Sequence, residues 1–570
     1  MASLPRASVA LVQSGGGVAS GSDLVAILSC TSAGTASQCT AHTRVQEAVD
    51  DYGLGEGLDF AAHYVEVTKK PFLFVKMPTV TAGALGAKDT TGVTGTSVIT
   101  FTGTPTDFAE IRLEVVTGGT IAAAGIVLKA STDGGRKYGG NVRLGTAVAY
   151  VIPGTGITAN FAAGTLVAGD YATQAVSAPM FNAAGLTAAR AAIVSQGRLP
   201  RLIVVCGDID GSVGDLQDVI DEIEAYETSD GRHAQVICAA RDWYPDAVMQ
   251  GEPADVDFDG TGDTITRATG SWITDGFKVG MTITVDGTSL NDGFSAVLTV
   301  VTGTVLTVAA GITTEANVNG NSFTLTASET KSSWRTAVEA IVGSTPSTAK
   351  ESTRTMFAAG RARRKSPLDG SKKRRPAAWP IAIRAMEHDL HISAAKVALG
   401  GLSGWSITDA DGLLEEHDER VDGGLLGIRV ACLTSTDEFA GVFCALPVTL
   451  AEDNTPLSRL QVGFVSDLCC TVAKRETTRR LNEEVILDPS TGYMLESERE
   501  AINKYVEGQL RAALLTQGPE GQRASDVTFA LATDVDMRTP GTAVPWEAVL
   551  TTLGYIERLS GTVRVPAGGE

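Results

Sequence analysis

Residues 201–207 (RLIVVCG), 215–227 (DLQDVIDEIEAYE) and 234–240 (AQVICAA) decide the fold of this chain. The first and last segments are short apolar runs, the pattern of buried strands. The middle segment repeats apolar residues at helical spacing. Those apolar residues are Leu216, Val219, Ile220, Ile223 and Tyr226. A strand, a helix and a second strand in this order predict a crossover unit, and therefore an α/β core.

The same mixed pattern occurs on the N-terminal side of this unit. Residues 43–52 (TRVQEAVDDY) predict a helix, with Thr43 and Gln46 spaced as a capping box. A strand is predicted at 72–76 (FLFVK), where every residue but the last is apolar. These elements extend the α/β core toward the N-terminus.

Toward the C-terminus the α/β pattern continues from about residue 331. One helix is predicted over 462–484, and another from an N-cap at Ser497 with Glu500 in the capping-box position. Strands that would form a sheet beside these helices are predicted at 428–434, 441–450 and 526–537.

Two blocks rich in glycine and threonine interrupt this pattern, at 81–190 and at 250–330. In both, apolar residues alternate with polar ones, as half-buried strands require. The alternating apolar residues are Ile111, Leu113 and Val115 in the first block and Met281, Ile283 and Val285 in the second. Because α/β sequence returns after each block, we interpret both as β domains inserted into one interrupted core.

Each end of the chain carries a strand without a predicted partner, VALVQ at 9–13 and TVRVP at 562–566. The predicted fold class is therefore a multidomain α/β (α+β) chain, with a discontinuous core, two inserted all-β domains and extended terminal arms. The predicted division is an N-terminal arm (1–20), a first segment of the α/β core (21–80), an inserted β domain (81–190), a second segment of the α/β core (191–249), an outer inserted β domain (250–330), a C-terminal α/β core (331–557) and a C-terminal arm (558–570).

Length and charge limit the classes of function. The chain has 570 residues, enough for about two to four domains, and 43% of them are hydrophobic. Its 46 Lys and Arg against 66 Asp and Glu give a net charge of 46 − 66 = −20, which argues against direct nucleic-acid binding. No apolar run reaches the length of a membrane span or a signal peptide, so we expect no membrane insertion and a cytoplasmic site of assembly.

Eight cysteines are present, without C-x-x-C spacing. They are Cys30, Cys39, Cys206, Cys238, Cys432, Cys444, Cys469 and Cys470. Cys206 and Cys238 lie in apolar strand-like runs, where a free thiol behaves as a small hydrophobic group. We expect free thiols, with disulfides as the alternative if the protein matures outside the cell.

The sequence contains no recognisable catalytic motif. It has no P-loop, no G-x-S-x-G elbow and no H-E-x-x-H, and Gly53, Gly55 and Gly57 indicate a turn after a helix. Two polar groups could bear on metal binding: His388 with His391, and the cluster Glu415, Glu416, His417 and Asp418. Because neither has a further ligand at metal spacing, we interpret both as hydrogen-bonding groups and expect no enzyme activity, metal or cofactor.

One basic strip contrasts with the acidic background. It consists of Arg361, Arg363, Arg364, Lys365, Lys372, Lys373, Arg374 and Arg375. A solvated loop and a surface for an acidic protein partner are both open interpretations. Nucleic acid is a third, which the charge of the whole chain disfavours.

The order of several segments resembles the sheath proteins of contractile phage tails, which are related to those of R-type bacteriocins and type VI secretion. The segments that carry the resemblance are VALVQSGGGVASGSDLVAILSCTSAG (9–34), VQEAVDDYGLGEGL (45–58), KKPFLFVKM (69–77), GTPTDF (103–108), STDGG (131–135), GRARRKSPLDG (360–370), RRPAAWPIAIRAMEHDLHISAAK (374–396), GLSGWSI (401–407), TTRRLNEEV (477–485), EREAINKYVEGQL (498–510) and YIERLSGTVRVP (555–566). They span most of the chain, and the block at 250–330 is less general in this family.

The resemblance implies a structural subunit that forms stacked hexameric rings around a tail tube and contracts without nucleotide to drive the tube through the host envelope. It implies that terminal arms add strands to neighbouring subunits, here through Val9, Leu11, Val12, Val563, Arg564 and Val565. The implied partners are other copies of the chain, the tube protein, and baseplate and terminator proteins, in a virion. The basic strip could then face the tube.

Two other classes of protein remain open. A different tail or baseplate component would form small closed rings instead of long tubes. A β-rich adhesin or glycan-binding protein would bind sugars and need no terminal arms. An enzyme is the third alternative, and no convergent site supports it.

Overall fold

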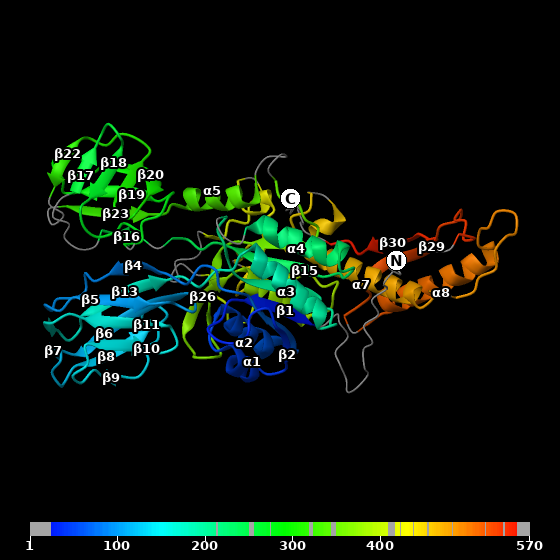
Figure 1. Ribbon diagram of the computed structural model, residues 1–570, viewed down its shortest axis with the longest axis horizontal. Helices are drawn as coiled ribbons and strands as arrows, with labels where there is room; N and C mark the ends of the chain where they lie inside the picture. Colours follow the sequence, from blue (N-terminus) through cyan, green and yellow to red (C-terminus); the bar gives the residue numbers. More distant parts are fainter. Residues whose placement is uncertain are drawn as a thin grey trace, which may run out of the picture. The chain divides into compact units, whose positions relative to one another are not determined.

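The computed structural model describes residues 24–555, with gaps at 212–214, 245, 250–255, 274, 319–322, 344–348, 408–415, 422, 437, 453–454, 482, 519 and 540–541. The chain divides into two compact units (Figure 1). Among the described residues, the small unit contains 389–391 and 461–555, and the large unit contains the rest. Both predicted terminal arms lie outside the described residues.

A six-stranded, mostly parallel sheet forms the centre of the large unit, in the order β2-β3-β1-β14-β15-β24. The strands are β1 (Val25–Ser29), β2 (Cys39–His42), β3 (Phe72–Lys76), β14 (Leu202–Ile209), β15 (Gln235–Ala240) and β24 (Thr355–Ala358). β14 pairs in parallel with β15, and helix α4 (Leu216–Thr228) connects them. The predicted crossover unit is therefore confirmed, as is the strand at 72–76.

Helices cover both faces of this sheet. Ala26, Leu28, Ile203 and Val205 face the cluster formed with α3 (Ala183–Ser195), α4 and α5 (Lys331–Val342). The alternate strand residues lie on the opposite face, where α2 (Glu56–Thr68) and α6 (Ala378–Glu387) contact β1, β14 and β15. Burial on both faces explains why these strands read as continuous apolar runs.

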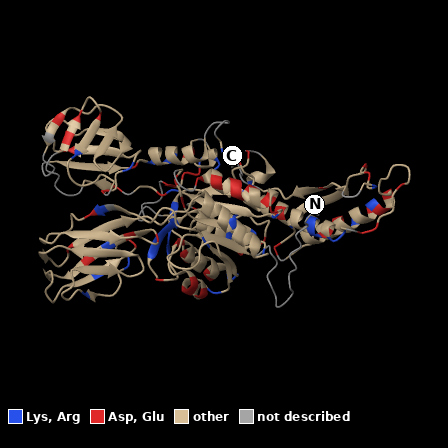
Figure 2. Ribbon diagram, viewed as in Figure 1, with Lys and Arg blue, Asp and Glu red and all other residues tan. Residues whose placement is uncertain are grey.

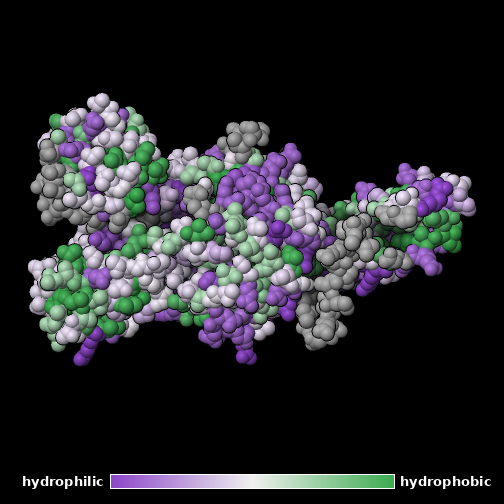
Figure 3. Space-filling model, viewed as in Figure 1, coloured by the Kyte–Doolittle hydropathy of each residue, from purple (hydrophilic) through white to green (hydrophobic). Residues whose placement is uncertain are grey.

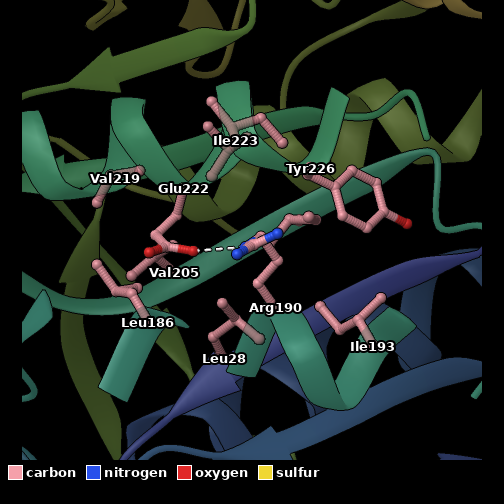
Figure 4. Close-up of a pocket in the computed structure, with 11 residues that line it drawn as sticks. Leu28, Leu186, Arg190, Ile193, Val205, Val219, Glu222, Ile223 and Tyr226 are labelled. Atoms are coloured by element: carbon pink, nitrogen blue, oxygen red, sulfur yellow. Dashed lines mark hydrogen bonds and ion pairs between the residues drawn. The ribbon is translucent and has the colours of Figure 1, made fainter. Parts of the chain in front are cut away.

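Figure 4 shows the packing between α3, α4 and the sheet around a small void of about 30 Å³. Leu186, Val219 and Ile223 line it from the two helices. At its edge, Nε of Arg190 lies 2.6 Å from a carboxylate oxygen of Glu222, so the two helices are joined by an ion pair as well as by apolar contact.

Two predicted helix starts are wrong. α1 (Val45–Tyr52) begins after Arg44, and no side chain caps it. Gln46 instead donates a hydrogen bond of 2.8 Å to Asp50, one turn further along the helix. In the small unit, α8 (Glu496–Leu514) begins after Leu495, one residue before the predicted cap at Ser497.

The first glycine-rich block forms three sheets with a core of their own. Their orders are β4-β13-β6-β8-β9, β10-β11-β5 and β12-β7. The strands are β4 (Leu85–Asp89), β5 (Ile99–Gly103), β6 (Ala109–Thr117), β7 (Gly119–Thr120), β8 (Val127–Ser131), β9 (Val142–Arg143), β10 (Ala149–Ile152), β11 (Ile157–Phe161), β12 (Thr165–Leu166) and β13 (Tyr171–Val176). The predicted alternation is confirmed, because Ile111, Leu113 and Val115 of β6 are buried. α3 begins within 81–190, but it packs with the parallel sheet.

The second block forms one eight-stranded sheet in the order β16-β23-β19-β20-β21-β18-β17-β22. The strands are β16 (Ala247–Val248), β17 (Val256–Asp259), β18 (Thr264–Arg267), β19 (Thr282–Asp286), β20 (Ser295–Val301), β21 (Val305–Val308), β22 (Glu315–Val318) and β23 (Thr324–Ser328). Its core includes Trp272, Phe277, Met281, Ile283 and Val285. The chain then returns to the parallel sheet through Trp334 and Val338 of α5.

The predicted strands at 428–434 and 441–450 are mostly wrong. Only β27 (Leu433–Thr434) and β28 (Phe443–Cys444) pair with each other. Val430 and Cys432 are buried in the core of the large unit, and Ala431 makes a single bridge to Ala358 at the end of β24. These apolar residues are therefore buried by packing against the sheet, without forming long strands.

The small unit contains α7 (Leu460–Thr478), α8, β29 (Ala524–Leu531) and β30 (Trp546–Thr552). α7 ends six residues before the predicted end at 484. Val506 and Leu510 of α8 are buried, and α8 packs on β29, where Val527 and Phe529 are buried. β29 and β30 pair antiparallel in a two-stranded ribbon, and β30 is not predicted from the sequence.

Candidate assembly and interaction sites

The basic strip forms a hairpin in the large unit (Figure 2). β25 (Arg361–Lys365) and β26 (Lys372–Pro376) pair antiparallel. The arginines at 361, 363, 364 and 375 are buried, Lys365 is exposed, and the other members are half-buried. The strip is therefore neither a solvated loop nor a continuous exposed positive surface.

Arg375 is fully buried between two carboxylates that are distant in sequence. Its Nε donates to Asp59 of α2 at 2.8 Å. Its Nη1 and Nη2 donate to the two oxygens of Asp107, in the first β block, at 2.7 and 2.6 Å. Burial raises the pKa of Asp59, but Arg375 and Lys373 outweigh this effect and hold that pKa below its usual range. Arg375 thus links the hairpin, α2 and the first β block.

Three further arginines of the hairpin are paired with acids of the same unit. Nη2 of Arg363 lies 2.9 Å from Glu110 of β6, and Nη2 of Arg364 lies 2.8 Å from Glu66 of α2. Arg361 pairs with Asp208 of β14. The acidic partners come from the core and from the first β block.

Arg374 forms a second buried group with Asp242 and Glu416. Its Nη2 lies 2.9 Å from Asp242 and also pairs with Glu416. The carboxylate of Glu416 accepts the backbone N–H of Arg361 at 2.9 Å. Burial raises the pKa of Glu416 to about 7, although Arg374 opposes this. Most of the positive charge of the hairpin is therefore compensated inside the large unit.

These acidic partners are not predicted from the sequence. Asp59 is 316 residues from Arg375 and Asp107 is 268 residues from it, so no local pattern links them. Asp208 lies near the end of β14 and Asp242 follows β15 by two residues. Acids at the carboxyl ends of parallel strands were the available signal, because such ends share one edge of a sheet.

The two other polar groups bind within the chain. α6 ends at Glu387, so His388 and His391 do not share a helix face. Nε2 of His391 lies 3.1 Å from the carbonyl oxygen of Glu520, within the small unit. In the part of the chain that the structure describes, no group of three or more His, Cys, Asp or Glu is arranged to hold a metal ion.

In the cluster at 415–418, Glu416 and His417 contact the hairpin. Glu415 lies outside the described residues. Nε2 of His417 lies 2.7 Å from the carbonyl oxygen of Arg361. Burial lowers the pKa of His417 to about 4, so this ring is neutral at pH 7. Asp418 binds Arg420 at 2.6 Å.

All eight cysteines are free thiols, and all except the half-buried Cys470 are buried. Burial raises the pKa of Cys30 to about 11 and that of Cys39 to about 12. The predicted glycine turn is confirmed, since Gly53 ends α1 with a φ of 75° and Gly55 precedes α2.

The ribbon β29–β30 is the second candidate site. Its register runs from Ala524 opposite Thr552 to Leu531 opposite Trp546. Within the described residues neither strand has a second strand partner. Along β30, Trp546 is 39% exposed and Val549 is 54% exposed. An edge strand with unpaired backbone groups and exposed apolar side chains can accept a further strand.

The solvent face of α4 is acidic (Figure 2) and hydrophilic (Figure 3). Asp221 and Glu224 are exposed there, while Glu222 and Asp230 bind Arg190 and Glu227 binds Arg354. This face therefore contributes to the negative charge of the chain. No helix in the described part of the chain is long and apolar enough to cross a membrane.

Comparison with known proteins gives structural neighbours only. No protein-family model and no curated protein matches the chain. Among solved structures, a sheath tail protein of Listeria innocua is 11% identical, with 94% of this chain and 96% of that one covered and a TM-score of 0.33. A sheath tail protein of Desulfitobacterium hafniense is 10% identical, with 96% and 100% covered and a TM-score of 0.36. A chain of the anti-feeding prophage baseplate is 11% identical, with 41% and 66% covered and a TM-score of 0.26.

Proposed function

We propose that the chain is a structural subunit of a contractile tail sheath. The open ribbon β29–β30 is the observation that supports this proposal most directly, together with the terminal segments at 9–13 and 562–566. A sheath subunit needs an acceptor for strands and strands to donate, and this chain has a candidate for each.

The outer edge of β30 is the better acceptor. On β29, the backbone N–H of Leu531 already donates to the Asn503 side chain of α8 at 2.9 Å. β30 has seven residues, enough to pair with the five residues of VALVQ. Main-chain hydrogen bonds would hold the added strand, and its apolar side chains would pack on Trp546 and Val549.

The donated strands would contain Val9, Leu11 and Val12 at one end and Val563, Arg564 and Val565 at the other. These residues would leave their own subunit and pair with ribbons of neighbouring copies. Such links would persist while whole subunits move. They depend on short paired strands and do not require two neighbouring subunits to keep a fixed orientation. The lattice would be stacked hexameric rings that contract around a tube, with free energy stored in subunit contacts and no nucleotide.

The further partners in this proposal are a tube protein, a baseplate protein and a terminator protein. A role for the basic strip at the tube is restricted by the burial of its arginines. Lys365 and the exposed turn residues 367–369 are the most accessible part of the hairpin for such a contact, since Leu368 is 43% exposed and Arg375 is fully buried. We expect no catalytic activity, and a location in the virion after assembly in the host cytoplasm.

Negative-stain electron microscopy tests this proposal. The purified chain should form long helical tubes, and a version without residues 1–17 and 560–570 should remain folded but form none. Small closed rings from both versions would favour another tail or baseplate component. Monomers from both, with binding to a glycan array, would favour an adhesin.

A further inference from the structure

A cavity of about 340 Å³ lies in the large unit at the carboxyl ends of β14 and β15. This edge of a parallel sheet is where open α/β folds place their ligands. Asp208 of β14 and Asp242 after β15 form part of its polar wall. Phe108 and Trp243 contribute aromatic rings, so the cavity has both polar and apolar sides.

Glu56 is the unusual group in this wall. It is the first residue of α2, is only 6% exposed, and lines the cavity. Among the described residues, its carboxyl group has no hydrogen bond and no ion pair within 4 Å. A buried carboxyl group without a donor is costly, and native structures normally provide a partner.

Three of the four basic side chains of the wall are already paired, and the fourth, Lys278, is exposed. Arg361 pairs with Asp208, Arg374 pairs with Asp242, and Arg241 pairs with Glu329. Glu56 is therefore a buried group of the wall without a hydrogen-bond partner among the described residues. A ligand with a positively charged donor would give the ionised carboxylate its strongest kind of partner.

Electrostatics agrees with a cationic ligand. Burial, and then repulsion from Asp208, raise the pKa of Glu56 to about 8, while Arg375 opposes the shift. At pH 7 the group therefore carries a proton that a cation can replace. A bound metal ion is disfavoured, because no group of three or more metal-binding side chains occurs among the described residues.

We propose that this cavity binds a small organic cation whose primary ammonium group donates hydrogen bonds to Glu56 and Asp208. The aromatic wall would then contact the hydrocarbon part of the ligand. Cations are attracted to aromatic faces as well as to carboxylates, so both sides of the cavity suit this class of ligand. The inference does not depend on sheath assembly.

Isothermal titration calorimetry with n-butylammonium chloride tests the proposal on the full chain. We expect saturable binding, and none for n-butanol, which has the same length without the charge. Glu56→Gln should weaken binding at least tenfold, whereas Glu47→Gln, an exposed site on α1, should not change it. Equal binding of n-butanol, or unchanged affinity in Glu56→Gln, would overturn the proposal.

A second variant leaves the carboxyl group in place. Ala178→Phe would fill part of the cavity, because Ala178 lines it and is only half-buried. It should also abolish saturable binding while its thermal unfolding stays close to that of the unmodified chain. Undiminished binding in this variant would place the ligand elsewhere and contradict the proposal.

The affinity should also depend on pH. The titratable or charged groups that act on Glu56 are Asp208, Asp107, Arg361, Arg375, Cys30 and Cys206. Because the ligand competes with a proton, affinity should rise by roughly 50-fold between pH 6 and pH 8 if ionisation of Glu56 alone limits binding. An affinity independent of pH over this range would contradict a site built on Glu56.

Discussion

The guanidinium group of Arg375 binds both carboxylate oxygens of Asp107, with N–O distances of 2.7 and 2.6 Å. The same side chain also binds Asp59 through Nε at 2.8 Å. Planar two-point pairing of this kind fixes geometry as well as charge, and lysine cannot reproduce it. Arg375 therefore holds the first β block, α2 and the basic hairpin in one arrangement.

Replacing Arg375 should destabilise the large unit strongly. Arg375→Met leaves Asp59 and Asp107 without their shared partner, and such a break costs about 3–5 kcal/mol in buried pairs. The measurement is urea unfolding followed by circular dichroism. Arg420→Met is the matched control, because the Arg420 side chain is 68% exposed and solvent screens its pair with Asp418, so its loss should change stability little. Equal losses in both variants would show that the buried pair has no special role.

Glu56 should make stability fall as pH rises. Its pKa is raised from an ordinary value of 4.5 to about 8, so the folded state binds a proton more tightly than the unfolded state. Its stabilising contribution is fully present below pH 4.5 and is lost as pH rises through about 8, by at most about 1.4 kcal/mol per pH unit. Glu56→Gln does not titrate, so the unmodified chain should lose stability relative to this variant between pH 5 and pH 9. A constant difference in unfolding midpoint would contradict a raised pKa.

The void between α3, α4 and the sheet offers a test of core packing. Val219→Ile adds one methylene group beside a void of about 30 Å³, and should raise stability by about 0.8 kcal/mol. Ile223→Val, on the same face of α4, should lower it by about 0.5–1.5 kcal/mol. Thermal unfolding of the two variants checks both signs, and destabilisation by Val219→Ile would mean that the void cannot accept the added group.

The edge of β30 should control assembly without affecting folding. Val549→Lys places a charge on an exposed position where an added strand would pack, and charged edge residues prevent strand addition. We expect a folded subunit that forms no tubes in electron micrographs. Val297→Lys, at a 42% exposed position of β20, should assemble normally. Tubes of normal length from Val549→Lys would show that β30 is not the acceptor of the added strand.

The sequence predicts the regions of this fold that depend on local patterns. The periodicity at 201–240 predicts β14, α4 and β15 because both faces of the sheet and one face of the helix are buried. The strands predicted at 428–434 and 441–450 are mostly absent, because Val430 and Cys432 are buried by packing and apolar runs alone do not reveal their partners. The basic strip was visible in the sequence, but its burial was not, because its partners Asp59 and Asp107 are far away along the chain.

A cross-linking experiment tests the exchange of arms most directly. Cysteine at Leu11 together with cysteine at Val549 or at Thr551 would place a thiol on the N-terminal arm and another on β30, in a chain whose own thiols are buried except the half-buried Cys470. After assembly and mild oxidation, non-reducing gel electrophoresis should show a ladder of covalent multimers, with either single-cysteine variant giving none. Cross-links within single chains alone, or assembled tubes without any cross-link, would contradict the exchange of arms.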